Sequence, residues 1–237
     1  MRVPLARIAA VTIVALLAAA CGGAPSADLV PTAAPSTDTP RTASVTAATT
    51  AATTGGTLSW TVSDKSKAVV SVREQLVGVN LPSDAVLTAT GAKGTFSLNA
   101  DGTFGSGSKI TFDLTTLSSD SRDRDSFVKQ DTLATRQFPT ATFVPTKTSG
   151  LTLPLPASGD LAFTLTGILT IHGKDKTVTF DVKATRSGGD LTATATANPT
   201  LKFEDFGMSA PSVPFRVVSV VDEIRLVVTL VATGPAS

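Results

Sequence analysis

Few side chains in this sequence are of the types that catalyse reactions. His172 is the single histidine, so it is the one imidazole that could act as a general base near neutral pH. Asp120, Asp123 and Asp125 lie close to Arg124 and could in principle gather a Ca²⁺ ion. The spacing lacks the glycine and the terminal glutamate of an EF-hand loop. A solvated charge cluster is the simpler interpretation.

The motifs of common enzyme classes are absent from the sequence. We find no G-x-S-x-G nucleophile elbow, no P-loop and no dinucleotide-binding fingerprint. His172 precedes Gly173 in a turn sequence, where an imidazole most often makes a turn hydrogen bond. A single cysteine excludes an internal disulfide and a Cys-based zinc site. We therefore predict that the protein is not an enzyme, with no catalytic residue, no metal and no cofactor.

Charge and composition favour apolar recognition over electrostatic recognition. The 237 residues include 20 Lys and Arg against 19 Asp and Glu, a net charge of +1. Such a balance creates no field that would attract a nucleic acid, so we expect no nucleic-acid partner. Eleven Phe, one Trp and no Tyr make almost every ring purely apolar. This set of rings suits the wall of an apolar cavity.

The first twenty residues have the organisation of a bacterial export signal. Two arginines are followed by an apolar run from residue 8 to residue 20, which is too short to span a bilayer. Because Cys21 directly follows Leu17-Ala18-Ala19-Ala20, the segment resembles a lipobox, in which the cysteine sulfur receives a diacylglyceryl group. We expect residues 1–20 to be removed. Lipidated Cys21 would then anchor the protein to the outer side of the bacterial cell membrane, in contact with the bilayer.

Residues 21–56 are expected to be a disordered tether. They contain no aromatic residue and consist mainly of Ala, Thr, Ser, Pro and Gly. A segment of this composition cannot bury enough apolar surface to offset its conformational entropy. The folded domain is therefore predicted to span residues 57–237.

The domain has the sequence pattern of an all-β fold. Apolar and polar residues alternate in 110–114 and over the longer run 161–171, which is the period of a strand with one buried face. We predict about eight antiparallel strands, and the long runs favour a closed barrel over a sandwich. The segment from Ser118 to Pro139 breaks the alternation. We expect it to form one long loop with a short helix.

Four short motifs follow one another along the domain. They are Trp60-Thr61-Val62, Arg124-Asp125 with Phe138-Pro139-Thr140-Ala141-Thr142-Phe143, Gly167-Ile168-Leu169-Thr170-Ile171-His172-Gly173, and Phe203-Glu204-Asp205-Phe206-Gly207-Met208. In this order they resemble the motifs of the YceI-like family of secreted, extended lipocalin-like barrels. The resemblance covers nearly all of residues 57–232. One departure is Phe127-Val128, which stands where the family often has His-Leu.

The resemblance implies an extended eight-stranded antiparallel lipocalin-like barrel that binds a long polyisoprenoid chain, such as a quinone or a prenyl phosphate. Arg124 is the candidate contact for the polar head, and apolar residues at inward positions are the candidates for the tail. These are Trp60, Phe112, Leu114, Phe143, Leu161, Phe163, Leu165, Leu169, Phe180 and Phe206.

Two interpretations of the barrel interior are open at this point. In the first, which we prefer, the interior is hollow and holds an isoprenoid or a similar amphiphile, since each buried methylene stabilises binding by about 0.8 kcal/mol. In the second, the interior is filled and the domain is a ligand-free module that contacts another protein. Ala193, Ala195 and Ala197 share one face and would leave space unless large neighbours fill it.

Overall fold

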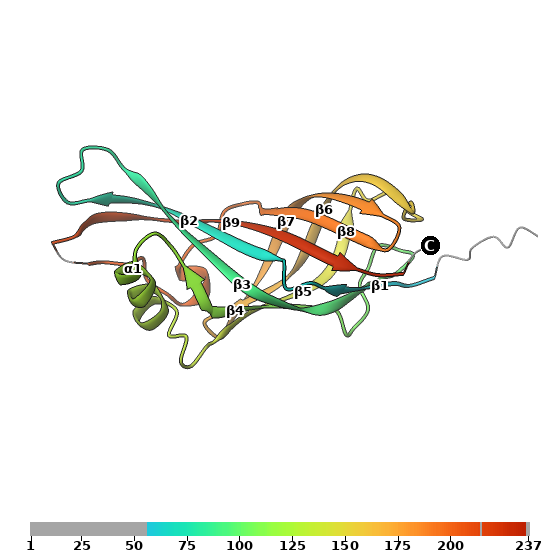
Figure 1. The fold of residues 1–237 in the computed structure, drawn as a ribbon, viewed down its shortest axis with the longest axis horizontal. Coiled ribbons are helices and arrows are strands. Elements are labelled where there is room, and N and C mark those ends of the chain that lie inside the picture. The colour runs from blue at the N-terminus through green and yellow to red at the C-terminus, as the bar shows by residue number, and fades with distance from the viewer. Residues whose placement is uncertain (1–55, 214, 236–237) are drawn as a thin grey trace, which may run out of the picture. The chain divides into compact units, whose positions relative to one another are not determined.

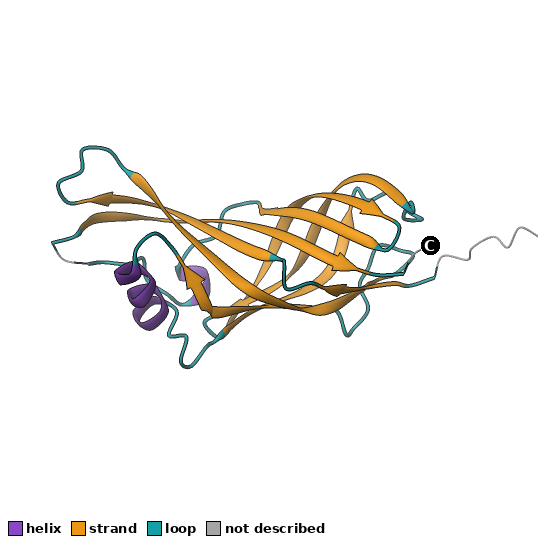
Figure 2. Ribbon diagram, in the orientation of Figure 1, coloured by secondary structure: helices purple, strands orange, loops and turns teal. Residues whose placement is uncertain are grey.

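The computed structural model describes residues 56–213 and 215–235. The predicted leader, Cys21 and the tether up to residue 55 lie outside the described residues. Strands dominate the described part of the chain (Figures 1 and 2). The strands are β1 (Leu58–Val62), β2 (Lys67–Leu76), β3 (Ser83–Leu98), β4 (Lys109–Ser118), β5 (Thr140–Ser149), β6 (Ser158–Ile171), β7 (Lys174–Ser187), β8 (Asp190–Ala197) and β9 (Val217–Thr233).

The helical elements are short. They are α1 (Arg122–Phe127), the π-helical turn η1 (Val128–Thr132) and the 3₁₀ turn η2 (Glu204–Phe206). Both α1 and η1 lie between β4 and β5, in the segment predicted to be a loop with a short helix. That prediction is confirmed.

All strand pairs are antiparallel, and the sheet closes on itself. The order is β1-β3-β2-β9-β8-β7-β6-β5-β4, and a further pairing of β3 with β4 completes the ring. β1 and β2 share one place in this ring, because each pairs with both β3 and β9. Between them, the fully buried hydroxyl of Ser66 accepts a hydrogen bond from the backbone N–H of Val231 at 2.9 Å. The predicted eight-stranded antiparallel barrel is therefore confirmed.

The two ends of the barrel differ. The β2–β3 hairpin, α1 and the start of β9 lie at one end, whereas β1 and the β7–β8 turn lie at the other (Figure 1). At the β1 end, Trp60 stacks on Phe96 with ring centroids 5.4 Å apart. The guanidinium of Arg186 lies 5.6 Å from the Trp60 ring centroid and donates to the carbonyl oxygen of Pro156 at 2.9 Å. These buried side chains fill the β1 end of the barrel.

Aromatic side chains also fill the middle of the barrel. The rings of Phe143 and Phe180 meet edge to face, with centroids 5.3 Å apart. Gly167 on β6 leaves the space that the Phe143 ring occupies: a Cβ atom at Gly167 would lie 2.4 Å from Cζ of Phe143. Gly167, the first glycine of the third motif, is therefore a packing residue.

We expect Gly167→Ala to lower the free energy of unfolding by about 2 kcal/mol, because the added methyl overpacks the core against a ring and a backbone oxygen. Urea unfolding measures the change. Gly107→Ala is the matched control, because a Cβ atom there has no neighbour within 4 Å. Equal stabilities of the two variants would contradict the packing role of Gly167.

The end of the third motif forms a hairpin turn. His172 and Gly173 connect β6 to β7 with φ angles of 51° and 70°, as a two-residue type I′ turn requires. The His172 ring packs against the Phe138 ring, with ring centroids 4.7 Å apart. Its Nδ1 lies 3.4 Å from the carbonyl oxygen of Phe206. The single imidazole is thus part of the contact between this turn and η2.

Candidate ligand cavity

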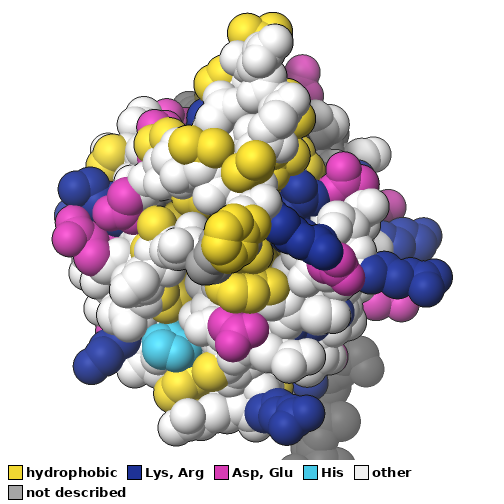
Figure 3. All heavy atoms as spheres, turned by 90° about the vertical axis from the view of Figure 1, so that its left-hand side faces the viewer, with side chains coloured by type: hydrophobic (Ala, Val, Ile, Leu, Met, Phe, Trp, Pro, Cys, Tyr) yellow, Lys and Arg dark blue, Asp and Glu magenta, His cyan; other side chains and the backbone are white. Residues whose placement is uncertain are grey.

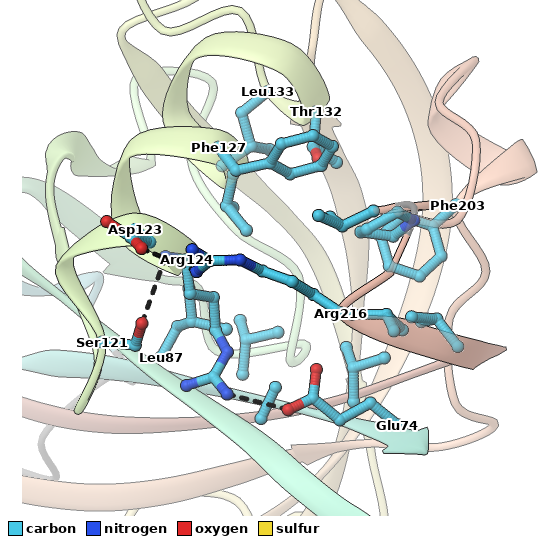
Figure 4. A pocket seen from close by; sticks show the side chains of 18 of the residues that line it. Glu74, Leu87, Ser121, Asp123, Arg124, Phe127, Thr132, Leu133, Phe203 and Arg216 are labelled. Atoms are coloured by element: carbon cyan, nitrogen blue, oxygen red, sulfur yellow. Dashed lines mark hydrogen bonds and ion pairs between the residues drawn. The ribbon is translucent and has the colours of Figure 1, made fainter. Parts of the chain in front are cut away.

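An apolar cavity of about 690 Å³ lies at the α1 end of the barrel (Figure 4). Its volume falls in the usual range of small-ligand pockets. Strands β2, β3, β4 and β9 form one part of its wall, and α1, η1 and the segment before β9 form the rest. Most lining residues are aliphatic or aromatic.

The strand walls follow from the two-residue period. On β2, Val70, Val72, Glu74 and Leu76 all face the cavity, and across the sheet Ala85 of β3 pairs with Val72. Glu74 belongs to the same inward row as the valines, so its carboxylate is carried into an apolar wall. Its side chain is only 8% exposed.

The α1–η1 segment covers one side of the cavity. It begins with Ser121, whose hydroxyl accepts from the backbone N–H of Arg124 at the N-cap of α1. Asp125 secures the approach to the helix, because its carboxylate accepts from the hydroxyl and the N–H of Ser119 at 2.6 and 2.7 Å. Phe127 and Val128 then line the cavity. The pair that replaces the family's His-Leu is therefore an apolar part of the wall.

One ion pair lies inside the cavity. Arg124 Nη2 donates to Glu74 Oε1 at 2.8 Å, and its second terminal nitrogen contacts the exposed Asp120. The Arg124 side chain is 20% exposed. A second pair, Arg216 with Asp123 at 2.8 Å, lies at the solvent-exposed edge (Figure 4). The guanidinium of Arg124 is therefore already matched by two carboxylates.

The structure places the predicted site residues in two groups. Leu114 and Arg124 line the cavity. The remaining nine candidates are not among the lining residues and pack in the barrel core. These are Trp60, Phe112, Phe143, Leu161, Phe163, Leu165, Leu169, Phe180 and Phe206. The alanine row of β8, from Ala193 to Ala197, packs in the same core, so the open volume lies at the other end of the barrel.

Sequence reasoning missed the residues that line most of the cavity. Among them are Val72, Ala85, Leu87, Phe203 and Met208. The alternation of Val70, Val72, Glu74 and Leu76 was the available signal, and a charged residue in an apolar row marked a buried polar contact. The contribution of α1 and of the segment after η2 depends on tertiary packing and has no periodic signal.

The fourth motif contributes two side chains to the cavity wall. Phe206 is fully buried, and Gly207 ends η2 in the left-handed conformation with φ 66°. Phe203 and Met208 on either side face the cavity. The Asp205 carboxylate accepts from Lys176 Nζ and, at 3.0 Å, from the backbone N–H of Lys202.

The hydrogen bond from Lys176, aided by the N–H of Lys202, lowers the pKa of Asp205 below its usual value of 3.8, although burial opposes the shift. A lowered pKa means that the ionised carboxylate stabilises the fold above pH 3.8, and that this contribution is lost as the pH falls through the folded-state pKa. We expect Asp205→Asn to reduce the free energy of unfolding by about 1.5 kcal/mol at pH 7.

The difference in the free energy of unfolding between Asp205→Asn and the parent protein should become smaller towards pH 3. Urea unfolding at both pH values measures it, and Asp131→Asn, at an exposed position, should stay within about 0.5 kcal/mol of the parent. A difference that stays constant with pH would contradict the role of the ionised carboxylate.

Within residues 56–213 and 215–235, no cluster of three or more His, Cys, Asp or Glu side chains is arranged to hold a metal ion. Over the same residues, no helix has the length and apolarity needed to cross a membrane.

A closed antiparallel barrel with an apolar cavity at one end is the architecture of the lipocalin-like binding barrels. The YceI-like domain model matches residues 60–232, so the chain belongs to the YceI-like family. A curated relative, a UPF0312 protein of Pseudomonas putida strain F1, is 37% identical over 113 residues. That match covers 44% of this chain and 54% of the relative, so the chain spans about half the length of the curated relatives it matches.

Solved structures share the fold. A polyisoprenoid binding domain from Saccharophagus degradans, implicated in plant cell wall breakdown, superposes with a TM-score of 0.55 at 11% identity. The match covers 75% of this chain and 99% of that domain. A mutant YceI protein of Campylobacter jejuni gives a TM-score of 0.50 at 17% identity, over 67% of this chain and 90% of the other.

Proposed function

We propose that this protein is a membrane-tethered extracytoplasmic binding protein that holds a polyisoprenoid or a similar amphiphilic lipid, and that it is not an enzyme. The observation that carries the proposal is the apolar cavity of about 690 Å³, with one ion pair inside it. The tail would lie among the inward side chains of β2, β3 and β9. Contact with these side chains stabilises each buried methylene by about 0.8 kcal/mol.

The charges around the cavity favour an uncharged polar head, such as a quinone or an alcohol, over a phosphate. Arg124 contacts both Glu74 and Asp120, and Arg216 contacts Asp123. These five side chains together carry one more negative charge than positive. A phosphate would have to compete with Glu74 for the guanidinium, in a part of the cavity where unpaired charge is costly. A carbonyl or hydroxyl oxygen could accept from Arg124 without separating the pair.

Two further observations support the proposal. The family resemblance extends to the fold of a domain described as polyisoprenoid binding. The lipobox-like sequence before Cys21 supports export and anchoring at the cell membrane, with residues 22–56 as the connection to the barrel. Lipidation at Cys21 is part of the proposal.

The proposal is tested by purifying the full chain from bacterial membranes, recording its native mass and extracting the lipids that accompany it. We expect an added mass that extracts as an isoprenoid. Titration should then show that geraniol, or a quinone with two isoprene units, binds more tightly than geranyl diphosphate. A protein that stays free of lipid and binds none of the three probes would overturn the proposed function. Tighter binding of the diphosphate would overturn the assignment of the head.

A further inference from the structure

Large apolar side chains are exposed at the open end of the barrel. We call residues 77–82, at the β2–β3 turn, together with residue 213 and residues 215–221, at the start of β9, the apolar tip. Exposed fractions are 95% for Phe215, 76% for Leu81 and 65% for Val218. Figure 3 looks onto this end and shows hydrophobic side chains gathered on it. Clusters of exposed apolar side chains of this kind mark interaction surfaces.

The tip carries almost no charge. Between residues 76 and 83, and again between 208 and 221, the single charged residue is Arg216. Along the chain, the next carboxylates after these two segments are those of Asp84 and Asp222. Arg216 pairs with Asp123 at 2.8 Å, so this cation adds no net charge to the tip. An apolar surface that carries so little charge is complementary to the apolar side of a bilayer interface.

Phe215 combines its exposure with an unusual backbone conformation. Its φ angle is 64°, in the left-handed region that bulky residues rarely adopt. The side chain is nevertheless directed into solvent. A strained residue that presents a ring to solvent indicates a functional contact more than a folding contact.

The tip and the cavity are continuous. Val77, Val79, Val213, Phe215 and Val217 all belong to the tip and also line the cavity. A lipid that enters the cavity past these residues would therefore cross the tip. Polyisoprenoids reside in bilayers because their tails are insoluble in water, so the entrance of a cavity that takes them directly has to reach the bilayer.

We propose that the apolar tip inserts into the interfacial region of a lipid bilayer and places the cavity mouth against the acyl chains. The kind of lipid that passes through the mouth rests on the proposed function, but the contact between tip and bilayer does not. The chain enters the barrel at β1, at the opposite end from the tip, so contact through the tip is separate from the proposed attachment at Cys21 (Figure 1).

A tryptophan placed on the tip tests the insertion. The full chain carries Cys21→Ser, so that no lipid can be attached there, together with Phe215→Trp. Vesicles contain three parts phosphatidylcholine with brominated acyl chains and one part phosphatidylglycerol. Bromine quenches only an indole that contacts the acyl chains, so the signal reports which part of the molecule inserts. The native Trp60 is buried at the β1 end and provides an unquenched background.

Ser106→Trp is the matched control, because Ser106 is exposed in the β3–β4 connection near the β1 end. We expect quenching and a blue shift for Phe215→Trp and neither for Ser106→Trp. Adding Leu81→Asp or Val218→Asp should raise the lipid concentration for half-maximal quenching about tenfold each, since each change removes one aliphatic side chain from the contact.

Three results would overturn the proposal. The first is an unquenched Phe215→Trp protein at millimolar lipid, and the second is equal quenching of both probes. The third is a blue shift without lipid, accompanied by dimers in sedimentation equilibrium, which would assign the tip to contact between copies of the chain.

A separate titration distinguishes the insertion from the proposed function. Leu81→Asp should bind a two-isoprene quinone in vesicle-free buffer with unchanged affinity, because Leu81 does not line the cavity. Quenching of Phe215→Trp in a protein that binds no isoprenoid would leave the bilayer contact standing and overturn the proposed ligand alone.

Discussion

Under the proposed function, replacing Ala85 by phenylalanine is expected to weaken isoprenoid binding about fiftyfold. Ala85 lies on β3 with its side chain buried in the cavity wall, opposite Val72 of β2. A phenyl ring at this position would occupy the space of about three methylenes of the tail. At about 0.8 kcal/mol each, the loss is about 2.4 kcal/mol, which corresponds to that change in affinity. Isothermal titration with a two-isoprene quinone measures it.

The adjacent residue provides the control for this change. Val86 points to the outer face of the same strand and is 45% exposed, so Val86→Phe introduces the same ring outside the barrel. We expect Val86→Phe to bind the quinone with the affinity of the parent protein. Both variants should retain the strand signal in circular dichroism. Unchanged binding by a folded Ala85→Phe protein would place the ligand elsewhere.

The barrel was predictable from the sequence because its cause is local. Alternation in 161–171 and the break at Ser118–Pro139 reflect which side of a strand faces the core, and each can be recognised within a dozen residues. The conformations of His172 and Gly173 likewise follow from a two-residue hairpin. The motifs that indicate the family consist largely of such local features: the packing glycine Gly167, the turn at His172 and Gly173, and the end of the 3₁₀ turn at Gly207.

The cavity was less predictable because inward-facing is not the same as cavity-lining. Phe143 and Leu114 are both apolar and both face the interior, yet Phe143 packs against Phe180 while Leu114 borders open volume. Whether an inward side chain meets another side chain or empty space depends on what the opposite strands supply. Here large rings meet in the middle of the barrel, whereas β2 and β3 supply smaller aliphatic side chains such as Val72 and Ala85 at the α1 end.

The packed part of the barrel and its open end therefore have different roles. Aromatic packing around Gly167 fills the middle of the barrel, and the Trp60–Arg186 contact fills the β1 end. The α1 half can then remain hollow, since the strands that form it continue into the packed half. In the proposed function, this division explains how one barrel is both filled and able to hold a lipid.

Removing Arg124 alone is expected to destabilise the protein by about 3 kcal/mol. Arg124→Met would leave the Glu74 carboxylate, which is 8% exposed, without its guanidinium inside an apolar wall. Breaking one side of a buried ion pair costs more than the pair itself contributes, because the other charge stays desolvated. The double variant Glu74→Leu/Arg124→Met should regain most of that loss, since two apolar side chains replace the pair. Urea unfolding of the parent, both single variants and the double variant measures the coupling.

The exposed pair of Lys202 and Glu204 is the matched control, with side chains 56% and 69% exposed. Glu204→Gln should change the free energy of unfolding by less than about 0.5 kcal/mol, because water solvates whichever charge is left. The double variant also separates the two parts of the ligand. It should still bind a purely hydrocarbon isoprenoid such as squalene, since the wall is more apolar than before, and should lose the preference for a quinone head. A double variant as unstable as Arg124→Met would show that the destabilisation comes from lost packing of the arginine stem, and the ion pair would then have no special place in the cavity.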